Sequence, residues 1–74
     1  MKISDFLKEQ RKARCLTQDQ MAKLIGVNRT TYATYENEWK DKKGKLRVPG
    51  AKTIKRISKL TGCSISYINK MIKE

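Results

Sequence analysis

The sequence contains no histidine and only two cysteines, Cys15 and Cys63, which stand far apart in the chain. Zinc sites need closely spaced cysteine and histidine ligands, so these residues predict no metal site. The chain also has no paired acids at a useful spacing and no serine or cysteine beside a plausible base. We therefore expect no enzyme, no catalytic residues, no metal, no cofactor and no small-molecule ligand.

Long apolar runs are missing as well. No stretch approaches the length of a signal peptide or of a membrane-spanning helix. The cysteine spacing alone does not exclude a disulfide, but nothing signals secretion, and thiols inside cells are usually reduced. These features predict a cytoplasmic protein that does not associate with membranes.

Acidic residues are scarce, with 7 Asp and Glu against 18 Lys and Arg, which gives a net charge of +11 over 74 residues. A chain of this length forms one small domain, which we expect to span residues 1–74. So large an excess of one sign destabilises the compact state by self-repulsion. Either the partner is a polyanion such as DNA or RNA, or the basic surface serves solubility.

The segment from Leu16 to Asn37 predicts two short helices joined by a tight turn at Gly26. Thr17 and Gln20 have the spacing of a capping box, and Leu16 and Met21 have that of a hydrophobic staple. Apolar residues at Met21, Leu24 and Ile25 repeat with the helical period. Gly26 stands where a positive φ ends a helix, and Asn28 is the N-cap of the next one.

The second of these helices has two unlike faces. One face is apolar, formed by Val27, Tyr32 and Tyr35, and is expected to be buried. The other face is small and polar, led by an arginine, and suits entry into the major groove of DNA. Its members are Arg29, Thr30, Ala33 and Thr34.

The whole segment resembles the helix-turn-helix of the lambda repressor and Cro-type regulators. Counted from Gln18, the family has a small residue at the fifth place and glycine at the ninth, which are Ala22 and Gly26. Ala22 is small because two helices cross there, and Gly26 permits the turn. The family's apolar places are filled by Met21, Ile25, Val27, Tyr32 and Tyr35, and the Tyr35-Glu36-Asn37 ending also matches. The resemblance implies an all-α, compact five-helix domain with the helix-turn-helix in its second and third helices, over about residues 17–37.

The remaining helices follow from apolar spacing. A first helix is expected over residues 2–14 with an apolar stripe of Ile3, Phe6, Leu7 and Ala13. A fourth begins after Pro49-Gly50, contains Ile54, Ile57 and Leu60, and ends at Gly62. A fifth is capped by Ser64 and carries Ile65, Ile68, Met71 and Ile72.

The two cysteines have different expected environments. Cys15 stands where the family commonly has glycine, and the sequence leaves open whether its backbone is left-handed. Cys63 is expected to be a small core residue rather than a reactive thiol.

The resemblance implies roles position by position. Arg29 would read guanine, Thr30 and Thr34 would contact base edges, and Ala33 would let the helix lie deep in the groove. Gln18, Asn28 and Asn37 would contact phosphate, although capping is the main expected role of Asn28. Arg11 and Glu36 would form a buried ion pair; the alternative is that Arg11 touches phosphate while Glu36 is solvated.

Residues 38–48, EWKDKKGKLRV, depart from the family, whose connection here is short. Long loops are usually functional or disordered. The basic residues form either a phosphate clamp or a mobile loop with only diffuse attraction for DNA. We expect some of them to contact DNA, and Trp39 to anchor the loop to the domain. They are Lys40, Lys42, Lys43, Lys45 and Arg47.

The sequence thus predicts a sequence-specific DNA-binding transcriptional regulator, a small prokaryotic or phage repressor of the Cro kind. Its partner would be operator DNA, bound by a two-fold dimer. The apolar side chains of the last helix serve either that dimer or the core, and the sequence does not decide between them. The alternative function is a basic RNA-binding or protein-interaction module, antitoxins included, that retains the fold.

Overall fold

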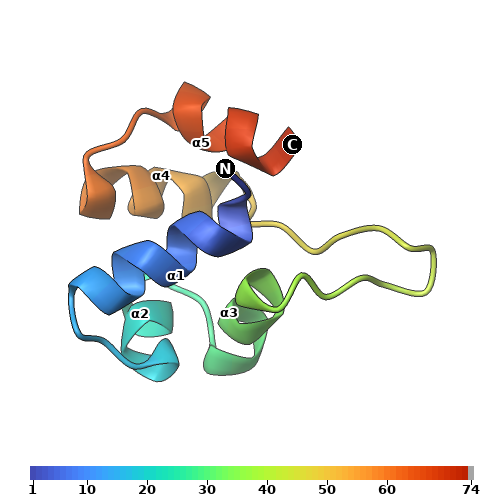
Figure 1. Cartoon of the computed structure of the whole chain (residues 1–74), viewed down its shortest axis with the longest axis horizontal. Coiled ribbons are helices and arrows are strands. Elements are labelled where there is room, and N and C mark those ends of the chain that lie inside the picture. Colours follow the sequence, from blue (N-terminus) through green and yellow to red (C-terminus); the bar gives the residue numbers. More distant parts are fainter. Residues whose placement is uncertain (74) are drawn as a thin grey trace.

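The computed structural model describes residues 1–73, and these form five helices and no strand. The predicted all-α, five-helix architecture is confirmed. In Figure 1, α1 lies between the α2–α3 pair and the α4–α5 pair. α1 packs against α3 and α5, while α2 packs against α3 and α4. The helices are α1 (Ile3–Ala13), α2 (Gln18–Ile25), α3 (Arg29–Glu36), α4 (Ala51–Thr61) and α5 (Ile65–Lys73).

A single core draws on all five helices. Its largest fully buried side chains are Leu7, Met21, Ile25, Tyr32, Ile57 and Ile68. Ala22 is also buried, as the helix crossing requires. Within residues 1–73, no helix combines the length and the apolar content that crossing a membrane would need.

Three apolar residues of the predicted stripes lie outside this core. Leu24 and Ile65 are 48% and 42% exposed, and Ala13 is exposed too. Only the first two turns of α1 are buried, and there the polar Ser4 is buried beside Ile3, Phe6 and Leu7. The helical period was therefore right, but the expected width of the buried stripe was wrong, because burial depends on what lies opposite each position.

The predicted helix starts are confirmed. Thr17 and Gln20 form the capping box, with the Gln20 N–H donating to Thr17 Oγ1 at 3.2 Å and the Thr17 N–H donating to Gln20 Oε1 at 2.9 Å. Asn28 Oδ1 accepts from the Thr31 N–H at 2.7 Å. Ser64 Oγ accepts from the Tyr67 N–H at 3.1 Å. Each bond satisfies an otherwise unpaired backbone donor in a first turn.

The helix ends use left-handed residues. Gly26 and Gly62 have φ of 77° and 76°, as predicted. Cys15, which the sequence left open, has φ of 55°. After α1 the Leu16 N–H donates to the Arg11 carbonyl at 3.1 Å and the Cys15 N–H to the Lys12 carbonyl at 3.0 Å, which is the Schellman arrangement. Both cysteines are free thiols: Cys15 is exposed, and Cys63 packs, partly buried, against the core.

The basic segment between α3 and α4 forms a hairpin rather than an open loop (Figure 1). Lys40 and Leu46 pair across it in an antiparallel bridge. Asp41 closes the turn, since its Oδ1 accepts from the backbone N–H groups of Lys43 and Lys45, both at 2.9 Å. Gly44 has φ of 78° in this turn. Asp41 was not singled out from the sequence, although aspartate often accepts a hydrogen bond from the backbone two residues further on in turns.

Candidate nucleic-acid interface

The buried side of α3 fixes the helix against the rest of the domain. Tyr32 is fully buried and Tyr35 is 6% exposed, and their rings meet edge to face with centroids 6.5 Å apart. The Tyr32 hydroxyl donates to the Leu7 carbonyl of α1 at 3.4 Å. Burial raises the pKa values of both tyrosine hydroxyls.

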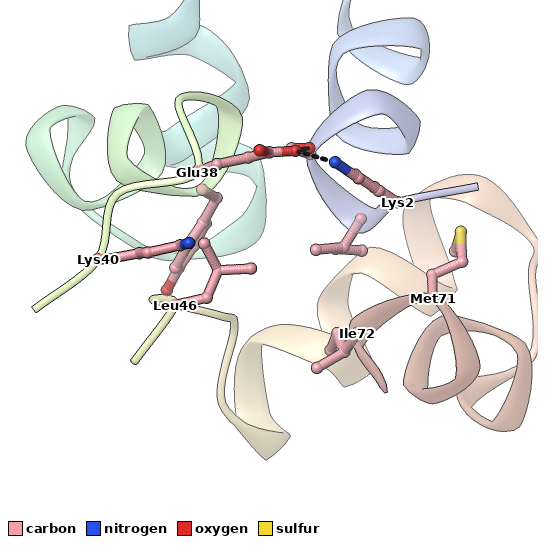
Figure 2. Close-up of a pocket in the computed structure, with 9 residues that line it drawn as sticks. Lys2, Glu38, Lys40, Leu46, Met71 and Ile72 are labelled. Carbon is pink, nitrogen blue, oxygen red and sulfur yellow. Dashed lines mark hydrogen bonds and ion pairs between the residues drawn. The ribbon is translucent and has the colours of Figure 1, made fainter. Parts of the chain in front are cut away.

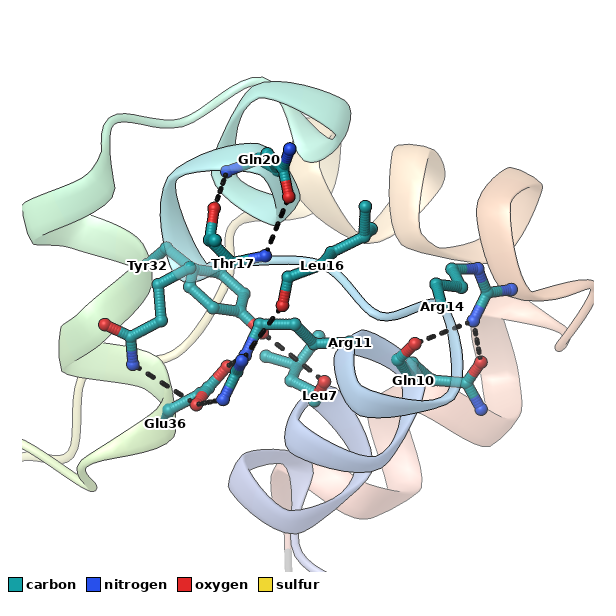
Figure 3. Close-up of polar contacts among 10 residues, drawn as sticks. Leu7, Gln10, Arg11, Arg14, Leu16, Thr17, Gln20, Tyr32 and Glu36 are labelled. Atoms are coloured by element: carbon teal, nitrogen blue, oxygen red, sulfur yellow. Dashed lines mark hydrogen bonds and ion pairs between the residues drawn. The ribbon is translucent and has the colours of Figure 1, made fainter.

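The end of α3 is tied to α1 by an ion pair. Arg11 Nε donates to Glu36 Oε2 at 2.8 Å, and Arg11 Nη2 donates to Glu36 Oε1 at 3.2 Å (Figure 3). The predicted ion pair is therefore present, and Arg11 Nε and Nη2 donate to Glu36 instead of to a phosphate. Burial alone would raise the pKa of Glu36, but hydrogen bonds, the one from Arg11 foremost, outweigh it and lower the pKa below its usual value.

The opposite side of α3 carries the four residues expected to read bases. Arg29 and Thr30 are exposed, whereas Ala33 and Thr34 are half-buried. The Thr34 hydroxyl donates to the Thr31 carbonyl, so its proton is engaged within the helix. The first turn of α3 therefore offers more free hydrogen-bonding groups than its last turn.

The N-termini of α2 and α3 open onto one hollow. It is lined by Arg11, Thr17, Gln18, Asp19 and Arg29. Gln18 Nε2 donates to Glu36 Oε1 at 3.3 Å, an engagement that the sequence did not predict. That bond uses one amide hydrogen and leaves the second available for an anion.

Residues 7–68 match the sequence model of the helix-turn-helix family. The chain belongs to this family, whose members are DNA-binding regulators of the lambda repressor type. Comparisons with curated proteins and with solved structures found no significant match.

In this helix-turn-helix protein, two further residues expected at phosphates lie at the ends of α3. Asn28 caps the N-terminus, and its side-chain oxygen is occupied by that bond. Asn37 is exposed at the C-terminal end, where its N–H donates to the Ala33 carbonyl. Its side chain is thus accessible beside the outward face of the helix.

The hairpin divides its basic residues between two faces. Because Lys40 pairs with Leu46, the pairs on either side, Trp39 with Arg47 and Asp41 with Lys45, point the opposite way. Lys45 and Arg47 line one hollow with Trp39, Asp41, Leu46 and Val48. Lys40 therefore points away from Lys45 and Arg47, and the clamp stays a prediction.

Lys40 lies on the far face of the hairpin. It points with Leu46 into a hollow of about 170 Å³ that is shared with Lys2, Glu38, Met71 and Ile72 (Figure 2). Glu38 there accepts from the buried Ser4 hydroxyl at 2.9 Å and pairs with Lys2 at 3.4 Å. The Ser4 hydrogen bond and the Lys2 charge lower the pKa of Glu38. These contacts tie the base of the hairpin to α1.

Trp39 lies beside α3, where it lines a hollow with Thr30, Thr31 and Thr34, and its role as the anchor of the hairpin stays a prediction. Its side chain is 46% exposed. The Arg47 guanidinium lies over the ring, 5.3 Å from the centroid. The sequence missed this pairing because it depends on the register of the hairpin, which brings residues 39 and 47 side by side.

The apolar side chains of α5 mostly close the core. Ile68 and Met71 are 0% and 3% exposed, and Ile72 packs against them partly buried. Ile65 is exposed, together with Tyr67, whose ring meets Phe6 edge to face with centroids 6.3 Å apart. Three of the four apolar residues, Ile68, Met71 and Ile72, therefore pack in or against the core, and Ile65 does not.

Proposed function

We propose that this helix-turn-helix protein is a transcriptional repressor that binds an operator in double-stranded DNA. The observation that carries the proposal is the two-sided construction of α3. One side is buried through Tyr32, Tyr35 and Glu36, and the other presents Arg29 and Thr30 to solvent. A helix fixed from behind, with short polar side chains in front, is suited to the major groove.

Base reading is assigned to the outward face of α3. Arg29 has the fork that fits guanine O6 and N7, and its exposure leaves this fork free. Thr30 offers a free hydroxyl, and Thr34 offers its methyl group to a thymine methyl because its proton is engaged. Ala33 adds no bulk between them, so the helix can approach the base edges closely.

Phosphate contacts are assigned to groups around α3. Gln18 supplies its second amide hydrogen at the start of α2, where the helix dipole also favours an anion. Asn37, Lys45 and Arg47 lie beyond the other end of α3, and Lys42 and Lys43 lie in the hairpin turn. Asn28 caps α3 through its side-chain oxygen and keeps its amide hydrogens for a phosphate, whereas Lys40, on the far face of the hairpin, is left out of the proposed surface.

One helix reads only a few base pairs, so we propose that two copies bind together on an inverted repeat. In two-fold helix-turn-helix complexes the half-sites lie about one helical turn apart. Occupancy would then depend on protein concentration, in the manner of Cro.

The test is selection from a randomised duplex library at two salt concentrations, with wild-type protein, Arg29→Lys and Lys59→Ala. Arg29→Lys keeps the charge but loses the fork, whereas Lys59 is an exposed lysine on α4. We expect wild type and Lys59→Ala to recover the same inverted repeat. Arg29→Lys should lose preference at one position per half-site, at a cost of about 1–3 kcal/mol.

Recovery of no motif, with binding that falls steeply as salt rises, would overturn the proposal. The charge would then act alone, and an RNA or protein partner would take the place of the operator.

A further inference from the structure

A small hollow lies between α3 and the base of the hairpin, beside the face assigned to base reading. It is lined by Thr30, Thr31 and Thr34 from α3 and by Trp39 and Arg47 from the hairpin. We propose that this hollow binds one nucleotide of the DNA backbone, with its phosphate on Arg47 and its deoxyribose against Trp39. The proposal rests on the proposed function and names a contact that sets the register of α3 on the duplex.

The geometry of Arg47 suits a phosphate. The Arg47 guanidinium lies over the Trp39 ring, with its Cζ 5.3 Å from the ring centroid. The N–H donors of a guanidinium form a planar fork that suits bidentate contact with phosphate oxygens. Holding the side chain on the ring also reduces the conformational freedom that binding would otherwise remove.

The backbone fixes this pair relative to α3. The Trp39 N–H donates to the Thr34 carbonyl at 3.1 Å, and the Arg47 N–H donates to the Trp39 carbonyl at 2.9 Å. Two backbone hydrogen bonds therefore connect α3 to Arg47 through Trp39. Glu38, the residue before Trp39, accepts a hydrogen bond from the Ser4 hydroxyl and is thereby held to α1. A contact placed this way can position the helix along the DNA instead of only attracting it.

The rest of the hollow matches a sugar better than a base edge. The indole is 46% exposed, and threonine methyl groups add apolar surface beside it. The Thr34 proton is engaged with the Thr31 carbonyl, which leaves the hydroxyls of Thr30 and Thr31 as the threonine donors of the wall. Such a wall has few of the ordered donors and acceptors that reading a base requires, so the contact should be independent of sequence.

Trp39 is the only tryptophan of the sequence, so tryptophan emission reports on this one side chain. The first experiment titrates the protein with the duplex recovered by selection and measures acrylamide quenching of Trp39. We expect quenching to fall at least about twofold on duplex binding, because the sugar covers the ring. Single-stranded DNA and RNA of the same sequence should protect it much less.

The second experiment measures duplex affinity by anisotropy of labelled DNA for five variants. Arg47→Ala and Trp39→Ala should each weaken binding about tenfold or more. The double variant should bind only slightly more weakly than either single variant, because both changes remove the same contact. Lys43→Ala removes the same charge from the hairpin turn and should cost only about two- to threefold. Trp39→Phe keeps a ring under Arg47 and should restore most of the affinity, which separates the contact from a folding defect.

The outcomes separate the two proposals. If wild type binds duplexes with sequence preference but Trp39 stays as accessible as in free protein, or Arg47→Ala matches Lys43→Ala, the subsite is wrong and the repressor proposal stands. Equal protection by single strands would mean base stacking and would also overturn the subsite. If wild type shows no sequence preference for duplex DNA, the proposed function fails, and Trp39 quenching with the affinity of Arg47→Ala on duplex DNA decides the subsite separately.

Discussion

The Arg56 side chain of α4 lies across the Gly26 turn of the helix-turn-helix. A Cβ atom built on Gly26 would be 3.0 Å from Arg56 Nε and 3.1 Å from its Cδ and Cζ. Glycine at position 26 is therefore favoured on two grounds: the φ of 77° disfavours other residues, and the Arg56 side chain would have to shift to admit a Cβ atom.

Gly26→Ala should destabilise the domain by about 1–2 kcal/mol, mostly through the left-handed backbone. Gly62→Ala is the matched control, because Gly62 has nearly the same φ of 76° with nothing within 4 Å of the added Cβ. Urea denaturation should show Gly26→Ala as the more costly change, and Arg56→Ala should remove that excess. Equal costs in the wild-type background would show that the Arg56 contact has no energetic weight.

Cys15→Gly should stabilise the domain by about 0.5–1 kcal/mol. Cys15 is exposed and has φ of 55°, so glycine relieves backbone strain and gives up little packing, although it raises the entropy of the unfolded chain. Cys15→Ala removes the thiol but keeps the Cβ atom, and it should bring no gain. Thermal unfolding under reducing conditions compares the three proteins, and a gain with alanine equal to that with glycine would contradict this explanation.

Glu36→Gln should destabilise the domain by about 2–4 kcal/mol at pH 7, because it leaves Arg11 without its buried carboxylate. Since the pKa of Glu36 is lowered on folding, its contribution is fully present well above the usual value of 4.5 and is lost as pH falls through the folded-state value. Stability measured from pH 7 to pH 2.5 should therefore fall less steeply on the acid side in Glu36→Gln. The exposed Glu9→Gln serves as the control, and an acid limb unchanged in Glu36→Gln would show that other groups govern it.

Asp41→Ala should loosen the hairpin while leaving global stability within about 0.5 kcal/mol of wild type. The Asp41 carboxylate accepts hydrogen bonds from the backbone N–H groups of Lys43 and Lys45. In Asp41→Ala both N–H groups lose this acceptor. Hydrogen exchange should speed up at these two amides and stay unchanged in the core helices. Asp41→Asn retains a side-chain acceptor and should behave nearly as wild type. Faster exchange throughout the domain in Asp41→Ala would instead show that the hairpin unfolds together with the core helices.

Local sequence patterns predicted the parts of the fold that neighbours along the chain decide. Thr17 with Gln20, Asn28 and Ser64 cap the helices as expected, because each bond joins residues three apart. Gly26 and Gly62 end helices in the left-handed region, because glycine adopts it without a steric penalty. The pair of Arg11 with Glu36, implied by family resemblance, is also present.

Only the tertiary structure decided which apolar positions are buried and how the inserted segment folds. Leu24 and Ile65 satisfy the helical period yet face solvent, whereas Ser4 is buried, because burial depends on the element that lies opposite. The register of the hairpin likewise separates Lys40 from Arg47 and places Arg47 on Trp39. By itself the sequence determined where the helices begin and end and which family they form. Contacts between residues distant in sequence decided the shape of the surface beside α3, since long-range packing is not encoded in any one short stretch.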